Sequence, residues 1–209
     1  MKEAGFEFSI EKPDVEEIYP HDLPTNQVAR YLASVKAEYF RPQLRDQIII
    51  TADTVVILDG CILNKPRDRE HAIEMLSMLA GRTHQVMTGV SIFSEEQEET
   101  FDETTEVTFE ELGASEIEFY IDHFKPFDKA GAYGAQDGLR REINPCSAEE
   151  KAFLKSIGKE NLFEESFTKK DPDDELVVIK NISGSYFNVM GLPVHKVYWH
   201  LKNWQINKM

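Results

Sequence analysis

The run Ile48–Val56 constrains the fold more than any other part of the sequence, because a single carboxylate, Asp53, interrupts its β-branched apolar residues. A run of this length and composition predicts a buried strand. An unpaired charge inside such a strand costs several kcal/mol, so Asp53 is expected at a strand end or bulge that opens into a pocket. A carboxylate in such a place is a candidate general base or metal ligand. The alternative is an aspartate in a turn between two short strands.

Helical and extended patterns alternate along the chain. Apolar residues at spacings of three and four, with capping residues such as Thr25, predict the helices, and Asp59-Gly60 predicts a hairpin. The predicted helices cover residues 24–40, 67–80, 115–124 and 194–204, and the predicted strands cover residues 6–10, 47–58, 84–93, 101–112 and 174–182. Strands and helices in this order predict an α/β fold with a central mixed sheet.

Composition narrows the class of protein. The 209 residues, 41% of them hydrophobic, suffice for one compact domain or for two small lobes that share a sheet. A net charge of −15 disfavours a nucleic acid polymer as a partner. It does not disfavour a nucleotide that binds as its metal complex.

The sequence carries no targeting signal that we recognise, and we expect a cytoplasmic protein. No apolar stretch of the sequence is long enough to span a membrane, and the first residues lack the apolar core of a signal peptide. Cys61 and Cys146 are too few and too scattered for a disulfide framework or a zinc site. This cysteine usage suits a reducing compartment.

Five blocks of sequence resemble the Maf family of nucleoside triphosphate pyrophosphatases in their order and intervals. They cover residues 48–56, 64–73, 79–90, 128–136 and 184–193, and the resemblance extends from about residue 6 to residue 201. It implies one Maf-like domain over residues 1–209. It also implies an elongated, twisted sheet flanked by helices, with a cleft between two lobes, similar to inosine triphosphate pyrophosphatases.

Hydrolysis between the α- and β-phosphates needs an activated water, neutralisation of phosphate charge and a leaving pyrophosphate that carries a divalent cation. Lys65, fixed before Pro66, is a candidate phosphate contact. The resemblance implies that Asp53 is the proton acceptor and that Lys36 faces the same cleft. It further implies Asp53 and Glu17 as ligands of Mg²⁺ or Mn²⁺, for which one or two carboxylates suffice. For both lysines and Glu17 the alternative is an ordinary solvated side chain.

Thr54 and Gln136 are the candidate substrate-binding residues. Maf proteins that prefer dTTP and UTP carry these residue types at the matching positions, and those that prefer a methylated guanosine triphosphate differ at both. An amide can donate to and accept from the edge of a pyrimidine, and a site built on such pairs rejects other bases. The resemblance therefore implies hydrolysis of dTTP and UTP to the monophosphate and pyrophosphate. It also implies a role in nucleotide house-cleaning, a link to septum formation and cell-division arrest, and a homodimer.

Two departures from the family pattern keep other functions open. The N-terminal Ser-x-Ser-Pro-Arg-Arg segment that holds the triphosphate in Maf proteins does not occur in this sequence. Either the start was assigned too late, or the chain is truncated, or the protein itself lacks the segment. A catalytically weak nucleotide-binding or regulatory Maf-like protein is therefore the alternative. A polar insertion at about residues 146–173 is expected to be a solvated surface excursion, which is cheap in free energy. If it is instead a lid or a partner-binding element, a protein-interaction module is a third possibility.

Overall fold

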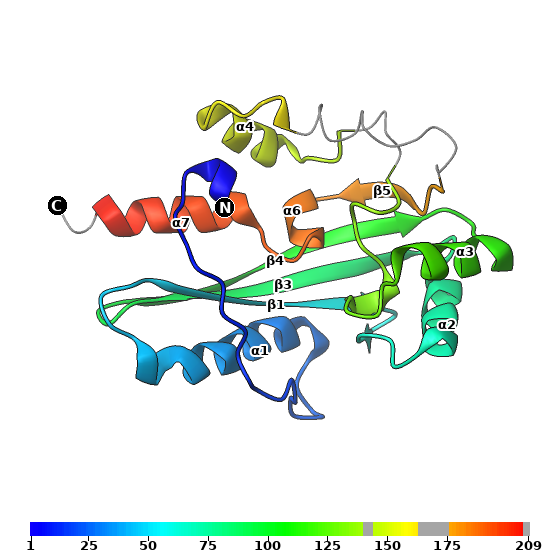
Figure 1. Ribbon diagram of the computed structural model, residues 1–209, viewed down its shortest axis with the longest axis horizontal. Coiled ribbons are helices and arrows are strands. Elements are labelled where there is room, and N and C mark those ends of the chain that lie inside the picture. The colour runs from blue at the N-terminus through cyan, green and yellow to red at the C-terminus, as the bar shows by residue number, and fades with distance from the viewer. Residues whose placement is uncertain (140–143, 163–175, 207–209) are drawn as a thin grey trace.

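The computed structural model describes residues 1–139, 144–162 and 176–206 of an elongated molecule built around one twisted sheet (Figure 1). The sheet order is β2-β1-β3-β4-β5. Its strands are β1 (Ile49–Leu58), β2 (Cys61–Leu63), β3 (Thr83–Phe93), β4 (Glu98–Phe109) and β5 (Ile179–Ser183). Neighbouring strands pair antiparallel, and an isolated parallel bridge joins Leu139 to Ile179. The expected α/β class, with a twisted sheet flanked by helices, is confirmed, but the five strands form an antiparallel sheet rather than the expected mixed one.

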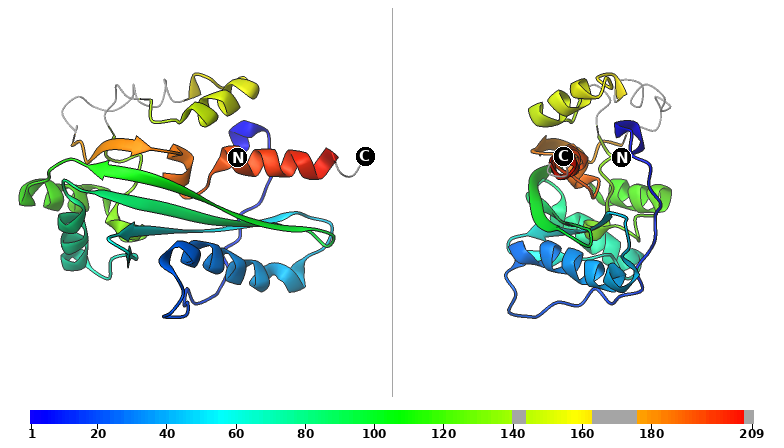
Figure 2. Two further views of the ribbon diagram at one scale, coloured as in Figure 1. Left: turned by 180° about the vertical axis from the view of Figure 1, so that it is seen from behind. Right: turned by 90° about the vertical axis from the view of Figure 1, so that its left-hand side faces the viewer.

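Helices lie on both faces and at one end of the sheet (Figures 1 and 2). They are α1 (Thr25–Phe40), α2 (Arg69–Leu79), α3 (Ala114–Phe124), α4 (Ala148–Ser156), α6 (Tyr186–Val189) and α7 (Val194–Ile206), and the 3₁₀ turns are η1 (Lys2–Ala4), η2 (Arg41–Gln43) and η3 (Ala130–Ala132). Helix α1 covers one face, and α6 and α7 cover the other. Within the described ranges, no helix has the length and apolar character needed to cross a bilayer.

Strand alternation sends alternate side chains to two different cores. On the α1 face, Val55 and Met87 pack against Val28 and Leu32. On the opposite face, Val90 belongs to a cluster with apolar residues of α7. Because both faces of β1 and β3 are covered, these strands are apolar through most of their length, as the sequence predicts.

The β1–β2 hairpin forms where the sequence predicts it. Asp59 and Gly60 have φ angles of 50° and 76°, and a two-residue turn of this kind requires positive φ at both central positions. The turn between β3 and β4 is closed by Ser94, whose N–H donates to the carbonyl of Gln97 at 2.8 Å. Strand β4 begins at Glu98 rather than Phe101, because β3 extends to Phe93, which pairs with Glu98.

Two local predictions are wrong. Residues 6–10 do not form a strand. Their alternation is not matched by burial, since Phe8 and Ile10 are 43% and 86% exposed. Helix α1 is capped by Pro24 rather than Thr25, which is already its first residue.

The expectation of a solvated excursion is also wrong for the start of the 146–173 insertion. Helix α4 buries Glu150, Phe153 and Leu154, which recur at the spacing of one helix face. The apolar side chains join a cluster with Tyr186 and Phe187. The polar composition of the segment had indicated a solvated loop instead. Residues 163–173 of the insertion lie outside the described part of the chain. Residues 174–175 of the predicted strand 174–182 also lie outside it.

Candidate active site

Asp53 lies within β1, paired with Gly89 of β3 in an unbroken register. The predictions of a strand end, a bulge or a turn at this residue are therefore wrong. Its side chain belongs to the face of the sheet that α1 covers. Strand β2 pairs with β1 only at Val56–Leu58, so in the described part of the chain Asp53 stands on a stretch of β1 whose outer edge has no strand partner. The side chain is 9% exposed. Burial raises the pKa of Asp53, and the hydrogen bond and charge of Lys36 offset this only in part, so the pKa stays above its usual value.

Lys36 reaches Asp53 from helix α1. Its ammonium forms a short ion pair with Oδ1 of Asp53 and lies 2.9 Å from Oε1 of Glu17. Burial lowers the pKa of Lys36, but the hydrogen bonds and charges of the two carboxylates outweigh it, so the pKa is raised. The lysine is therefore a cation held between two carboxylates.

Glu17 is brought to the site by the N-terminal segment, residues 6–23, which crosses from the α7 side of the sheet to the α1 side (Figure 1). Phe6 packs on the α7 face, and Tyr19 and Leu23 pack on the α1 face. Both ends of this segment are therefore anchored, and Glu17 lies near its α1 end.

Burial raises the pKa of Glu17, but the hydrogen bonds and charges of Lys36 and Lys65 outweigh this effect, so the pKa is lowered.

Lys65 completes the cluster from the turn after β2. Its ammonium bonds Oε2 of Glu17 at 3.0 Å, and its side chain is 53% exposed. The neighbouring Asn64 carbonyl accepts from the N–H of Gly131 at 3.2 Å, so the 128–136 block adjoins this turn. Gly131 has φ of 67°, and a Cβ there would lie 3.1 Å from Val56. The positive φ and this close approach to β1 both favour glycine here.

Thr54 lies on the face of the sheet opposite to Asp53. Its hydroxyl is 2.8 Å from that of Thr88 and 3.5 Å from the carbonyl of Gly191. The Thr88 hydroxyl donates to the carbonyl of Asn188 at 3.2 Å. Gln136 is exposed in the loop after η3, and its role in base recognition stays a prediction.

The structure thus brings together four of the predicted site residues, whereas Thr54 lies on the opposite face of the sheet. Asp53, Lys36, Glu17 and Lys65 form one chain of ion pairs. Sequence reasoning missed Thr88, although a buried hydroxyl in an apolar strand is a signal of the same kind as Asp53.

The cluster could hold a divalent cation only if water and substrate supplied most of the ligands. Among the described residues, no group of three or more His, Cys, Asp and Glu side chains could hold a metal ion. Asp53 and Glu17 nevertheless converge on one cation, the ammonium of Lys36. Because Mg²⁺ commonly takes one or two carboxylates and completes its shell with water and substrate phosphates, these residues fit such an ion.

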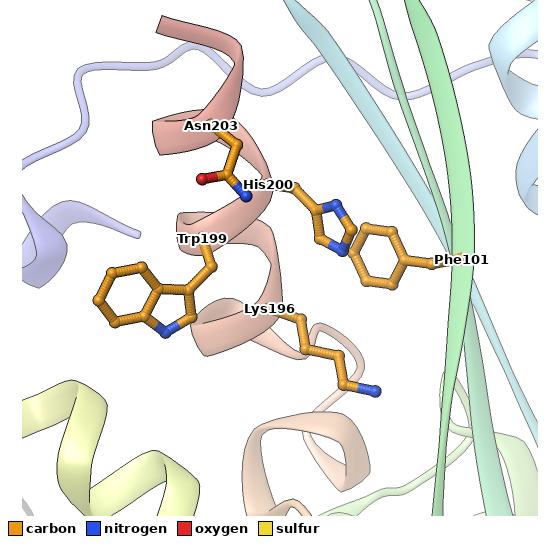
Figure 3. Close-up of a pocket in the computed structure, with 5 residues that line it drawn as sticks. All are labelled: Phe101, Lys196, Trp199, His200 and Asn203. Atoms are coloured by element: carbon orange, nitrogen blue, oxygen red, sulfur yellow. The ribbon is translucent and has the colours of Figure 1, made fainter. Parts of the chain in front are cut away.

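A pocket lies between β4 and α7 (Figure 3). It has a volume of about 260 Å³ and is lined by Phe101, Lys196, Trp199, His200 and Asn203. The rings of Phe101 and His200 stack with centroids 4.2 Å apart. None of the predicted site residues lines this pocket.

Comparison with known proteins identifies the family of the chain. A family model described as "Maf-like protein" matches residues 1–145. The chain belongs to the Maf-like family. This Maf-like protein is 38% identical over 204 residues to a dTTP/UTP pyrophosphatase of Bacteroides thetaiotaomicron, a match that covers 97% of the chain and 88% of the relative.

Two further relatives of this Maf-like protein carry the same description, dTTP/UTP pyrophosphatase. The one from Porphyromonas gingivalis is 39% identical over 96% of the chain and 86% of its own length. The one from Flavobacterium psychrophilum is 34% identical over 97% of the chain and 87% of its own length. The resemblance stated from the five blocks is confirmed.

Proposed function

We propose that this protein is a metal-dependent nucleoside triphosphate pyrophosphatase that hydrolyses dTTP and UTP to the monophosphate and pyrophosphate. The relatives are named for this activity. The observation that carries the proposal is the cluster of Asp53, Lys36, Glu17 and Lys65 at the unpaired edge of β1. It combines a buried carboxylate with two ammonium groups, as attack of water on a phosphate requires.

Asp53 is the general base in this proposal. A base works best when its pKa is close to the working pH, and burial moves the pKa of Asp53 in that direction. The residue also lies where the edge of the sheet is open to a ligand. It can therefore take a proton from a water that attacks the α-phosphorus.

The two lysines neutralise the triphosphate. In the free protein both ammonium groups are paired with carboxylates. Phosphate oxygens can replace the carboxylates as partners when a nucleotide binds, since both are anionic acceptors. Lys65, which is half exposed, is the one that can reorient with least loss of packing.

Asp53 and Glu17 are the residues that would hold Mg²⁺ or Mn²⁺. A bound divalent cation supplies charge neutralisation at the phosphates and the leaving pyrophosphate. Its arrival would leave the Lys36 ammonium to the substrate, because like charges cannot share one pair of carboxylates at low cost.

Thr54 and Gln136 are proposed as the base-recognition pair. Thr54 and Asp53 are successive residues of the same unpaired edge, with side chains on opposite faces. A nucleotide that lies across this edge can present its phosphates to Asp53 on one side and its base to Thr54 on the other.

The test is pyrophosphate release from dTTP, UTP, dCTP, GTP and 7-methyl-GTP, with Mg²⁺ or with Mn²⁺. We expect turnover of dTTP and UTP well above that of the other nucleotides. Equal turnover of all five would overturn the substrate assignment. If nucleotides raise the melting temperature but no pyrophosphate is released, the protein binds nucleotides without hydrolysing them.

A further inference from the structure

Glu150 is a fully buried carboxylate that the proposed chemistry does not use. It lies on helix α4, in the insertion, and is 0% exposed. Oε1 accepts from the Ser185 hydroxyl at 2.6 Å and from the Phe187 N–H at 2.7 Å. Oε2 accepts from the N–H groups of Ser147 and Tyr186 at 2.8 Å and 3.1 Å. Each oxygen thus faces two donors, an arrangement that suits a carboxylate and no neutral side chain.

Three of these four bonds fix one short segment of chain. Ser185, Tyr186 and Phe187 begin helix α6, which packs on the sheet opposite to α1. Ser185 also bonds Thr105 of β4 through its N–H and its carbonyl, both at 3.0 Å. Its hydroxyl accepts from the N–H of Asn188 at 3.0 Å. The start of α6 is therefore hydrogen-bonded both to Glu150 of α4 and to Thr105 of β4.

The segment fixed in this way is the one that holds Thr54. Asn188 is 0% exposed, and its side-chain amide donates to the carbonyl of Val86 at 2.9 Å. Its own carbonyl accepts from Thr88, whose hydroxyl bonds that of Thr54. Because Thr88 donates to Asn188, Thr54 is the donor in its bond to Thr88. The carbonyl of Gly191, three residues on, lies 3.5 Å from the Thr54 hydroxyl and is an alternative acceptor for the same hydrogen. A continuous path of hydrogen bonds thus runs from α4 to the residue beside the proposed base.

We propose that Glu150 is a positioning residue for nucleobase discrimination: it fixes the 185–191 segment and so sets where the Thr54 hydroxyl points. This inference rests on the proposed function, because it takes Thr54 as a base contact. It assigns the start of the insertion a role in specificity rather than in docking a partner.

The experiment compares the affinities for α,β-methylene-dTTP and α,β-methylene-dCTP by calorimetry, together with kcat and KM for dTTP and dCTP. The variants are Glu150→Gln and its matched control Glu149→Gln, which changes the neighbouring exposed carboxylate of the same helix. The amide of Glu150→Gln would set an N–H group against N–H donors. Ser185→Ala removes one donor to Glu150 together with the acceptor of the Asn188 N–H, and it serves if Glu150→Gln does not fold, as judged by circular dichroism.

We expect Glu150→Gln to lower the preference for the thymidine analogue about tenfold, the worth of one hydrogen bond, and Glu149→Gln to leave it unchanged. We expect KM for dTTP to rise while kcat changes little. In a Thr54→Val background, Glu150→Gln should have almost no further effect on preference, because both changes act through the same hydroxyl.

The inference is overturned by an unchanged preference in Glu150→Gln, or in Ser185→Ala if Glu150→Gln does not fold. Additive losses with Thr54→Val would overturn it as well. A wild type that binds both analogues equally would also overturn it. A wild type that prefers the thymidine analogue but releases no pyrophosphate would sink the proposed activity instead. The effect of Glu150→Gln on that preference would then decide the inference from binding.

Discussion

Lys36 and Asp53 face each other from helix α1 and strand β1, and the same ammonium lies 2.9 Å from Glu17. Asp53 is buried and its pKa is raised even with this counter-charge beside it. A buried ion pair of this kind adds little to stability, because desolvation of the two charges offsets their attraction. The geometry therefore agrees with a group retained for chemistry rather than for stability.

Asn in place of Asp53 should abolish turnover and leave the fold intact. The substitution keeps the volume and removes the base, which lowers the rate by about 10²–10⁴-fold for this kind of catalysis. Pyrophosphate release from dTTP measures the rate, and thermal melting measures the fold. Asp59→Asn is the matched control, since Asp59 lies in the exposed turn of the same hairpin. An Asp53→Asn protein with the wild-type rate would show that the base is another group.

Met in place of Lys36 should move the acid limb of the pH–rate profile to higher pH. Lys36 lowers the pKa of Asp53 by its hydrogen bond and charge, so its removal raises that pKa further, and the base is lost to protonation sooner as the pH falls. The measurement is kcat/KM for dTTP against pH. Lys151→Met, which changes an exposed lysine of α4, should leave the limb in place.

The same variant gives a stability prediction with a definite sign. When the folded pKa of an acid lies above its unfolded value, the stabilisation is fully present below the unfolded pKa and is lost as the pH rises through the folded pKa. For Asp53 in Lys36→Met, this range runs from the pKa of an unfolded aspartate up to the raised pKa of the folded protein. As the pH rises through this range, the melting temperature of Lys36→Met should fall increasingly below that of the wild type. A constant difference would contradict the pairing.

Ala in place of Lys65 should weaken nucleotide binding with little effect on stability. The side chain is 53% exposed, and substitutions of exposed residues usually change stability by within about 0.5 kcal/mol. Loss of one charge-assisted bond to phosphate should raise KM for dTTP about tenfold or more. Lys12→Ala controls for net charge, because Lys12 is exposed on the same N-terminal segment as Glu17. Equal rises in KM for the two variants would indicate a long-range charge effect.

The sequence predicts strand β1 and the candidate base because these depend on local pattern. The run Ile48–Val56 is apolar enough to predict burial. A single carboxylate within it is costly to bury, which marks Asp53 as a candidate functional residue. The path of Glu17 could not be predicted in the same way, because it depends on where residues 6–23 cross the sheet. Family resemblance supplied Glu17, and the structure supplies its contacts with both lysines.

Glu150 shows a different limit of sequence reasoning. A polar segment with many charges is typical of a solvated surface, and only the donors of Ser185–Phe187 make burial of this carboxylate favourable. Those donors are 35 to 37 residues away in the chain. The local signals were the spacing of Glu150 with Phe153 and Leu154 and the capping-box pattern of Ser147 and Glu150.

Ala in place of Gly89 should separate helix α1 from the sheet and disturb the site without changing any of its residues. Gly89 pairs with Asp53 across β1 and β3, and a Cβ there would lie 2.3 Å from the backbone nitrogen of Arg30 in α1. Since backbone cannot rotate away as a side chain can, α1 must shift and carry Lys36 with it. We expect a loss of about 1–3 kcal/mol, the usual range for overpacking, together with reduced turnover of dTTP. Urea denaturation measures the first and pyrophosphate release the second. Gly113→Ala is the control, because its added Cβ meets only a flexible carboxylate at 3.4 Å, and equal losses in the two variants would rule out the clash as the cause.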